Sequence, residues 1–217
     1  ASLAREMASH FEMEIGDTVA GAIRSAAEDV GKATPHELSS VLAKHRRVIE
    51  VRCAFLASRK IADLSSLSRL CGDSLVLDEA KKSASESVER IAAFHAAKGL
   101  AELACLAGLE RAADLPPALV PEGDAEDKAE SVVPRRAYKG PFAGRGHIRT
   151  SEDEADLEAF SKKHKGAIRY SIYVQYWTDG VRNLREIADL VEGETGGRNT
   201  EFMLDYVELG KKQGAFK

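Results

Sequence analysis

Histidines are the first candidates for chemistry in this sequence, because imidazole binds zinc and exchanges protons near neutral pH. The six histidines are His10, His36, His45, His95, His147 and His164. None lies four residues from another, so no helix face offers the usual pair of zinc ligands. Two of them, His45 and His95, fall on the apolar seams of expected helices and could approach each other across a bundle. Interior histidines bonded to the backbone or to a nearby acid explain this placement better than a metal ion does, so we expect neither a metal nor a cofactor.

The other residue types that serve catalysis form no recognisable motif. The sequence contains no phosphate-binding Walker loop, no dinucleotide-binding glycine pattern and no Gly-x-Ser-x-Gly nucleophile turn. The carboxylates lie on the polar faces of expected helices or in an acidic loop, and no buried pair suited to acid–base catalysis stands out. The cysteines Cys53, Cys71 and Cys105 are widely spaced and form no Cys-x-x-Cys, which is typical of reduced thiols packed as small hydrophobic residues. We expect no catalytic residue in this chain.

The composition is that of an ordinary globular protein with room for one large domain or two small ones. Of the 217 residues, 44% are hydrophobic and 30% are charged, and the net charge is −4. This charge provides no general attraction to nucleic acid or to an anionic membrane. No apolar run approaches the roughly 20 residues that span a bilayer, and the first residues lack the pattern of a signal peptide. Together with reduced cysteines, these features indicate a cytoplasmic protein.

Residues 1–112 are expected to form a bundle of long helices. The first helix should run from about Leu3 to Val30, where apolar residues recur at the helical period. The sequence Thr34-Pro35-His36-Glu37 has the cap, the proline and the glutamate of a helix start, and the helix that follows could contain a break around Ser65-Ser66. A third helix should begin near Asp78. Heptad-like seams on three successive helices predict an antiparallel bundle, one that could self-associate.

Residues 113–150 are expected to connect the bundle to a C-terminal module. Pro116-Pro117 ends the helical region, and the acidic segment from Pro121 to Glu130 has almost nothing to bury, which is typical of a linker or loop. The segment from Pro134 to Thr150 contains no acid. Its candidate strip for an anion or a partner consists of Arg135, Arg136, Lys139, Arg145 and Arg149. The strip could bind nucleic acid, but an extended connector whose bases pair with neighbouring acidic helices explains the segment better.

Residues 151–217 have the outline of a winged-helix-like module. An apolar helix runs into the turn Trp177-Thr178-Asp179-Gly180, two further helices follow on either side of a Gly-Gly break, and a Gly-x-Phe tail ends the sequence. The expected core of this module consists of Trp177, Ile187, Val191, Phe202 and Tyr206. We therefore predict a mainly α fold, in which a long-helix antiparallel bundle is followed by the winged-helix-like module.

The charges of this module oppose the DNA binding for which many winged helices are used. Between Asn183 and Leu209 there are two basic and seven acidic residues, a net charge of −5. A helix that enters the major groove should bring Lys and Arg to the phosphates, which dominate affinity. Here the phosphates would repel the helix. We expect no sequence-specific binding of nucleic acid and interpret the module as a surface for protein contacts.

Two stretches of the sequence carry a family resemblance. One runs from Val133 to Pro141 with the sequence Val-Pro-Arg-Arg-Ala-Tyr-Lys-Gly-Pro, and the other runs from Trp177 to Ile187 with its Asp-Gly turn and Leu-x-Glu-Ile helix start. Residues 133–217 thereby resemble the C-terminal, non-catalytic extension of some bacterial members of the two-zinc, leucyl-aminopeptidase-like peptidase family. In such proteins an α/β catalytic domain comes first, and an Ala-rich helical stretch and a terminal helical module follow. The resemblance implies that this chain is an accessory module.

The catalytic residues of that family have no counterparts here. The family uses a His-x-Asp, an adjacent Glu-Glu, a further Asp and a late His to hold two zinc ions and position a base. In this sequence no histidine is followed two residues later by Asp, and no Glu-Glu occurs. We therefore expect that this chain is not an enzyme, although a parent protein with those ligands would be a zinc aminopeptidase.

Three hypotheses about function result. We favour a non-catalytic accessory, oligomerisation or regulatory region of an aminopeptidase-like protein, whose protein partner is its own catalytic domain or a second copy. The alternative is a winged-helix transcriptional regulator with the helical region as dimeriser, which sequence-specific DNA binding would reveal. The third is an enzyme that uses the bundle interior, which only His45 and His95 encourage. No membrane partner is expected.

Overall fold

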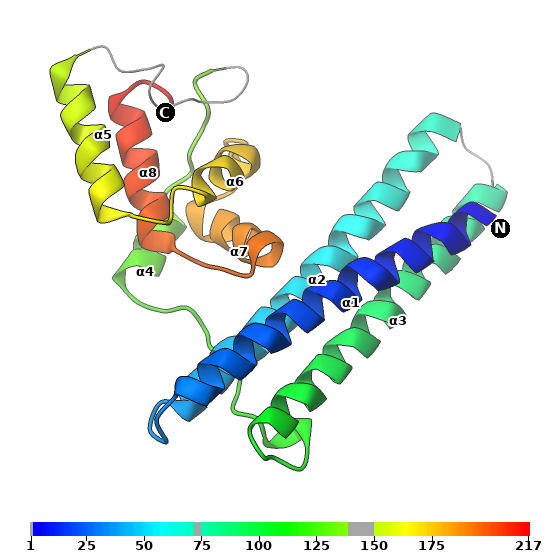
Figure 1. The fold of residues 1–217 in the computed structure, drawn as a ribbon. Helices are drawn as coiled ribbons and strands as arrows, with labels where there is room; N and C mark the ends of the chain where they lie inside the picture. The colour runs from blue at the N-terminus through cyan, green and yellow to red at the C-terminus, as the bar shows by residue number, and fades with distance from the viewer. Residues whose placement is uncertain (1, 72–74, 139–149) are drawn as a thin grey trace. The chain divides into compact units, whose positions relative to one another are not determined.

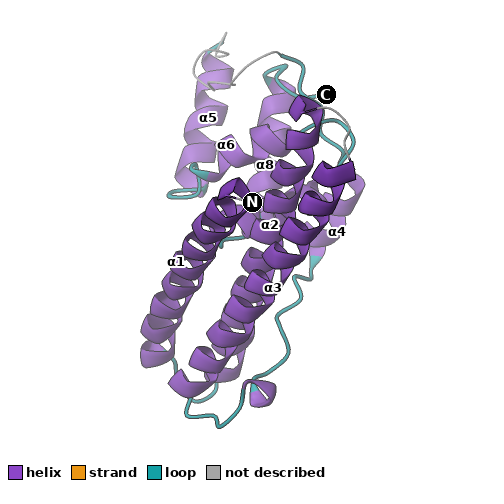
Figure 2. Cartoon of the chain, turned by 90° about the vertical axis from the view of Figure 1, so that its right-hand side faces the viewer, coloured by secondary structure: helices purple, strands orange, loops and turns teal. Residues whose placement is uncertain are grey.

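The chain is built almost entirely of helices. The computed structural model describes residues 2–71, 75–138 and 150–217, with side chains for all of these except 2–5, 67–71 and 75–77. Among the described residues there are eight α-helices, one short 3-10 helix and no β-strand (Figure 1; Figure 2). The mainly α fold predicted from the sequence is confirmed. The chain divides into two compact units, Ala1–Val120 and Pro121–Lys217, each with its own hydrophobic core.

Three long antiparallel helices form the first unit: α1 (Ser2–Lys32), α2 (Leu38–Cys71) and α3 (Leu75–Leu106) (Figure 1). Each of them contacts the other two, so that one apolar stripe of every helix faces a shared core. The largest side chains that this core buries completely are Phe11, Ile15, Ile49 and Leu103. The predicted bundle is therefore present. No helix in the described part of the chain is both long and apolar enough to cross a membrane.

Local hydrogen bonds explain where α2 begins and why it continues. The backbone nitrogen and the hydroxyl of Thr34 both donate to the Glu37 carboxylate, at 3.0 and 2.7 Å, so the predicted pair forms. It forms in a turn, and the first residue of α2 is Leu38 and not the predicted Pro35. The predicted break around Ser65-Ser66 is wrong, because α2 is continuous there. The Ser66 hydroxyl donates to the Asp63 carbonyl oxygen at 2.7 Å, and this bond keeps the polar side chain within the helix.

The segment after α3 is fastened to the bundle. It passes through the 3-10 turn η1 (Ala112–Asp114) and then runs along α2. The Arg46 guanidinium donates to the Pro116 carbonyl oxygen at 3.1 Å, and the Leu119 amide donates to the Ala43 carbonyl oxygen at 3.1 Å. Residues 113–120 therefore belong to the first unit, and not to a free connector.

The acidic segment predicted as a linker contains a helix. This helix, α4 (Asp124–Ser131), packs against α7 (Leu184–Thr195) and α8 (Thr200–Lys212) in the second unit. Ala129 is completely buried, and the Glu126 carboxylate is buried in an ion pair. The linker prediction is wrong here. A segment with few apolar residues can still pack against other helices when one of its carboxylates is buried in an ion pair.

Two more helices, α5 (Ser151–Lys163) and α6 (Tyr170–Trp177), complete the second unit. Reciprocal capping pairs begin α5 and α7, and they are Thr150 with Asp153 and Asn183 with Glu186. The helix α7 ends at Gly196, whose φ of 76° lies in the left-handed region that glycine adopts without strain. Short polar signals therefore begin α5 and α7, and a glycine ends α7.

The tail after α8 returns alongside the segment that follows α4. Arg136 and Phe216 form an isolated antiparallel bridge, and the Ala137 amide donates to the Ala215 carbonyl oxygen at 2.9 Å. The Phe216 ring lies so close to Gly210 that an added Cβ would overlap it. A winged helix usually includes strands, and the described residues show only this bridge. The mainly α class is thus established, while the winged-helix assignment stays a prediction.

Candidate functional site

The two histidines of the bundle core lie at different levels. His45 Nε2 lies 2.9 Å from Asp29 Oδ2 of α1, whereas the His95 ring packs against Gly16 of the same helix. Gly16 and Asp29 are 13 positions apart on α1, which corresponds to about 20 Å along a helix. The prediction that His45 and His95 could meet across the bundle is wrong. His45 instead has the acidic partner expected of an interior histidine, and it lowers the pKa of Asp29 by hydrogen bonding.

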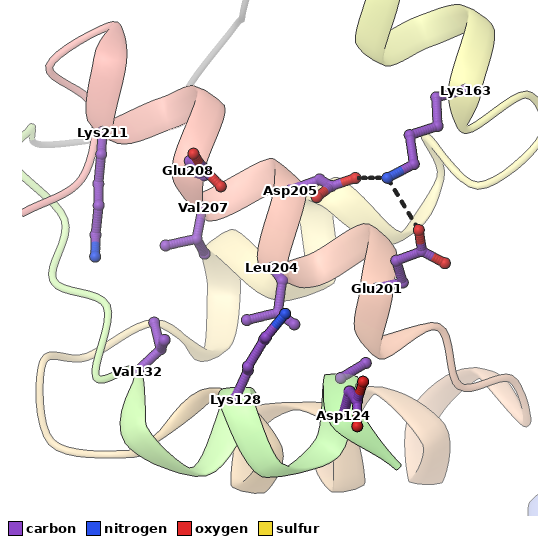
Figure 3. A pocket seen from close by; sticks show the side chains of 11 residues that line it. Asp124, Lys128, Val132, Lys163, Glu201, Leu204, Asp205, Val207, Glu208 and Lys211 are labelled. Carbon is purple, nitrogen blue, oxygen red and sulfur yellow. Dashed lines mark hydrogen bonds and ion pairs between the residues drawn. The ribbon is translucent and has the colours of Figure 1, made fainter.

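A third histidine is buried in the second unit. His164 follows α5, and its Nε2 lies 2.7 Å from Asp205 Oδ2 of α8. Lys163 donates to the same oxygen at 2.7 Å and lies 2.9 Å from Glu201 (Figure 3). Burial raises the pKa of Asp205, but the hydrogen bonds from Lys163 and His164 outweigh it, so the pKa is lowered. The His164 ring also packs against Phe160, at 4.9 Å between centroids, so this cluster joins α5 to α8 and does not present an imidazole to a substrate.

A groove of about 540 Å³ lies beside this cluster, between α4 and α8 (Figure 3). Leu204, Val207 and Val132 supply its apolar lining. Four acidic and three basic residues also line it, and Lys163 is already paired with two of the acids. Because the two signs of charge nearly cancel, the groove does not single out a class of ligand.

The strongest polar cluster of the second unit surrounds Arg198, between α7 and α8. Its guanidinium donates twice to the Glu126 carboxylate, at 2.6 and 2.9 Å, and also reaches Asp189 at 2.6 Å and Glu192 at 3.2 Å. The Thr200 hydroxyl donates to Glu126 at 2.5 Å. Hydrogen bonds from Arg198 hold the pKa of Glu126 below its usual value, against the opposing effect of burial. Every group in this cluster has a partner within the protein, so we assign it a structural role.

The five residues predicted as the core of the module lie close together. Ile187, Val191 and Phe202 are completely buried, and Tyr206 is nearly so. The rings of Phe202 and Tyr206 are stacked at 5.8 Å, with an angle of 7° between their planes. Trp177 is only partly buried and packs against the edge of this cluster.

Trp177 and the turn after it fix the C-terminal end of α6. The indole nitrogen donates to Glu194 at 3.0 Å, and the Arg182 guanidinium lies over the ring at 5.6 Å. Asp179 accepts hydrogen bonds from the backbone nitrogens of Val181 and Arg182, at 2.9 and 3.0 Å. These bonds lower the pKa of Asp179 and hold the Asp-Gly turn in one conformation.

An apolar ridge runs along the exposed side of α6 and the turns at its two ends. Its four members and their exposed fractions are Ile168 49%, Ile172 71%, Tyr176 68% and Val181 81%. Ile172 and Tyr176 are four residues apart within α6 and therefore share one face of the helix, Ile168 lies in the turn before it, and Val181 lies in the turn after it. Single exposed apolar residues are normal, and these four are grouped within 14 residues of the chain. We call these four residues the α6 ridge.

The opposite side of α6 packs into the core of the second unit. Val174 and Thr178 are completely buried, and Gln175 Nε2 donates to the Tyr206 hydroxyl at 2.6 Å. The sequence predicts an apolar helix here but does not distinguish its two faces. The available signal was an excess of apolar residues between Ile168 and Trp177, more than one buried face requires.

The structure describes only part of the predicted basic strip. Arg135 and Arg136 are exposed, and the backbone of Arg135 pairs with Lys217 at 2.9 and 3.3 Å. The aliphatic part of Arg135 packs beside Gly180. The other members of the strip, Lys139, Arg145 and Arg149, lie outside the described residues. The described part therefore has a positioning role next to the Asp-Gly turn.

The two described cysteine side chains differ in their exposure. Cys53 is buried, which raises the pKa of its thiol to about 11 and makes the thiolate scarce at neutral pH. Cys105 is exposed, and the side chain of Cys71 lies outside the described set. Among the described side chains, no three His, Cys, Asp or Glu residues converge as metal ligands.

Comparisons with known proteins identify no relative. No protein-family model, no curated protein and no solved structure matches this chain. The resemblance to the peptidase extension therefore stays a prediction from the sequence. Among the surfaces described above, the α6 ridge is the one that the fold itself does not explain.

Proposed function

We propose that this chain is a non-catalytic protein-contact module, of the kind that accompanies the catalytic domain of two-zinc aminopeptidase-like proteins. The α6 ridge carries the proposal. Ile172, Tyr176 and Val181 expose most of their surface, although their own unit is already folded around a complete core. Covering such a patch with another protein removes apolar surface from water, and this supplies affinity.

The surroundings of the ridge also suit a protein partner. Aromatic and arginine side chains contribute more than other types to the binding energy of protein interfaces. Tyr176 lies edge-to-face against Trp177 at 4.9 Å, and Arg182 lies over the same indole ring. The hydrogen bonds around Trp177 hold these groups in place before binding, which lowers the entropy that association costs.

A photo-crosslinking experiment in the full chain tests the proposal. One variant carries a photoreactive amino acid in place of Ile172, and a control variant carries it in place of Val133. Both variants are expressed and irradiated in the native host cells. Val133 is 48% exposed in the same unit but lies outside the ridge. We expect one discrete covalent product with a protein from position 172 and none from position 133. Equal, diffuse labelling from both positions would contradict a contact role for the ridge.

The winged-helix interpretation belongs to this proposal as its finer description of the fold. The order α6, α7 and α8, followed by a tail bridged at Phe216, supports it. A DNA-reading role would place α8 in the major groove, but α8 turns Phe202 and Met203 into the core and exposes Glu201 and Glu208. Phosphates would repel that exposed surface. Fluorescence anisotropy with a random duplex library at physiological salt should enrich no motif, and an enriched motif that depends on residues 199–209 would favour the regulator instead.

A further inference from the structure

We propose that α5 is a hinged cover over α8, which opens while the other helices of the second unit stay folded. The inference goes beyond the proposed function, because it concerns the surface of α8 and not the α6 ridge. Three features carry it, namely the small burial of α5, the contacts by which α8 holds it and the charges of the two helices.

The helix α5 contributes no buried residue to the second unit, whereas α7 buries six residues and α8 buries seven. It packs alongside α8 (Figure 1). A gap of about 210 Å³, lined by residues of these two helices alone, lies between them. Because the burial of apolar surface is the main source of stability, α5 is held less firmly than the helices that form the core.

One face of α5 and of the residue after it makes the contacts with α8. Its side chains recur at the helical period, and they are Asp156, Phe160, Lys163 and His164. Lys212 donates to Asp156 at 3.1 Å, and Lys163 is bonded to Asp205 and Glu201 at 2.7 and 2.9 Å. The two lysine side chains are 58% and 53% exposed, and ion pairs in water contribute little to stability.

The remaining contacts are between rings. The Phe160 ring lies 5.3 Å from the Phe202 ring and 6.1 Å from the Tyr206 ring, and the His164 ring lies 5.3 Å from Phe202. Phe160 itself is only partly buried. The aromatic core of the unit is therefore covered on this side by a helix that is not part of it.

The charges of the two helices oppose their contact. The helix α5 has five acidic and two basic residues, and α8 has three acidic and two basic residues. Outside the pairs named above, these two acidic helices repel each other. Lys163 is the main attraction across the contact, because it bonds to two acids of α8.

The turn after α5 provides the hinge. Gly166 has a φ of 87°, and among the described residues no atom lies within 4 Å of a Cβ added there. A released helix of 13 residues is marginally stable in water, so opening also exposes the backbone amides of α5 to solvent. The opened form uncovers the side of the Phe202 and Tyr206 rings that Phe160 covers.

Hydrogen–deuterium exchange of the full chain, measured by mass spectrometry, tests the inference. After correction for intrinsic rates, the slowest amides of α5 should exchange at least about tenfold faster than the slowest amides of α7. The reason is that a partial opening is more frequent than unfolding of the whole unit.

A conservative change in the core distinguishes partial opening from unfolding of the unit. Ile187 is completely buried in α7, and Ile187→Val should speed the exchange of α7 about three- to tenfold. The exchange of α5 should not change, because the valine destabilises the closed and the opened forms equally.

Two lysine variants test the electrostatic part of the contact. Lys163→Gln should speed the exchange of α5 about three- to tenfold, because it removes two ion pairs with α8 and leaves the repulsion. The matched control is Lys162→Gln, since Lys162 pairs with Glu158 of its own helix at 2.7 Å. It should speed α5 by less than about twofold.

Equal protection of α5 and α7 would overturn the inference. An Ile187→Val variant in which both helices exchange faster by the same factor would also overturn it, because α5 would then open only when the whole unit unfolds. Equal effects of Lys163→Gln and Lys162→Gln would refute the role of the ion pairs with α8 in holding the cover closed.

Discussion

Replacing Arg198 with methionine should destabilise the second unit strongly at neutral pH and only weakly at acid pH. The Arg198 side chain is 11% exposed, and its main partner, Glu126, is 7% exposed. Methionine keeps most of the aliphatic packing but removes the cation. The Glu126 carboxylate then stays buried with the Thr200 hydroxyl as a donor and without its opposite charge.

The expected magnitude is bounded by two estimates. Breaking a buried ion pair by removing one partner costs about 3–5 kcal/mol. Glu126 can avoid this cost by binding a proton, and from its ordinary pKa of 4.5 protonation costs about 3.4 kcal/mol at pH 7 and about 0.7 kcal/mol at pH 5. We therefore expect a loss of about 3 kcal/mol near pH 7 that shrinks to about 1 kcal/mol near pH 5.

Urea denaturation monitored by tryptophan fluorescence measures this loss in the intact chain. Trp177 is the one tryptophan of the sequence, so its emission reports unfolding of the second unit alone. The matched control is Asp189→Asn, whose side chain is 56% exposed in the same cluster and whose loss should stay below about 1 kcal/mol. A loss for Arg198→Met below about 1 kcal/mol near pH 7, or one equally large near pH 5, would refute this account of the cluster.

Three further experiments test the packing of Gly210, the ionisation of Glu126 and the absence of peptidase activity. Gly210→Ala should lower the unfolding free energy of the second unit by about 1–3 kcal/mol, measured through Trp177, because the new methyl group would overlap the Phe216 ring. Acidification below about pH 4.5 should destabilise the same unit, because Arg198 lowers the pKa of folded Glu126 and this stabilisation is lost as the carboxylate protonates; Glu126→Gln should flatten the pH dependence. With added zinc, the full chain should not hydrolyse a chromogenic aminoacyl substrate, and turnover that a chelator abolishes would contradict this.

The parts of the fold that the sequence predicts well depend on residues close together in the chain. Thr34 bonds to Glu37 just before α2, and Asn183 bonds to Glu186 at the start of α7. In both pairs the two residues are three positions apart. The seams of α1 to α3 are equally local, because a helical period repeats within one element. These signals need no knowledge of the tertiary structure, and the mainly α class follows from them.

The parts that the sequence does not predict depend on partners that are distant in the chain. Glu126 lies 72 positions from Arg198, and without that partner an acidic segment has the composition of a linker. Which residue of α1 lies opposite His45 depends on how α2 packs against α1. The helical period within either helix does not determine that packing. For α6, the composition alone does not say which of its two apolar faces the protein buries.

The two faces of α6 can be separated by their effects on folding and on association. Ile172 is 71% exposed and lies outside the core, so Ile172→Asp should change the unfolding free energy measured through Trp177 by less than about 0.5 kcal/mol. Val174→Ala on the buried face should instead cost about 1–3 kcal/mol, because Val174 is completely buried in the cluster. An aspartate at position 172 that unfolds the unit would show that the ridge belongs to the fold and is no free contact surface. An aspartate that leaves folding intact while abolishing association would show that the isoleucine serves a partner, because the fold then gains nothing from an apolar side chain in water.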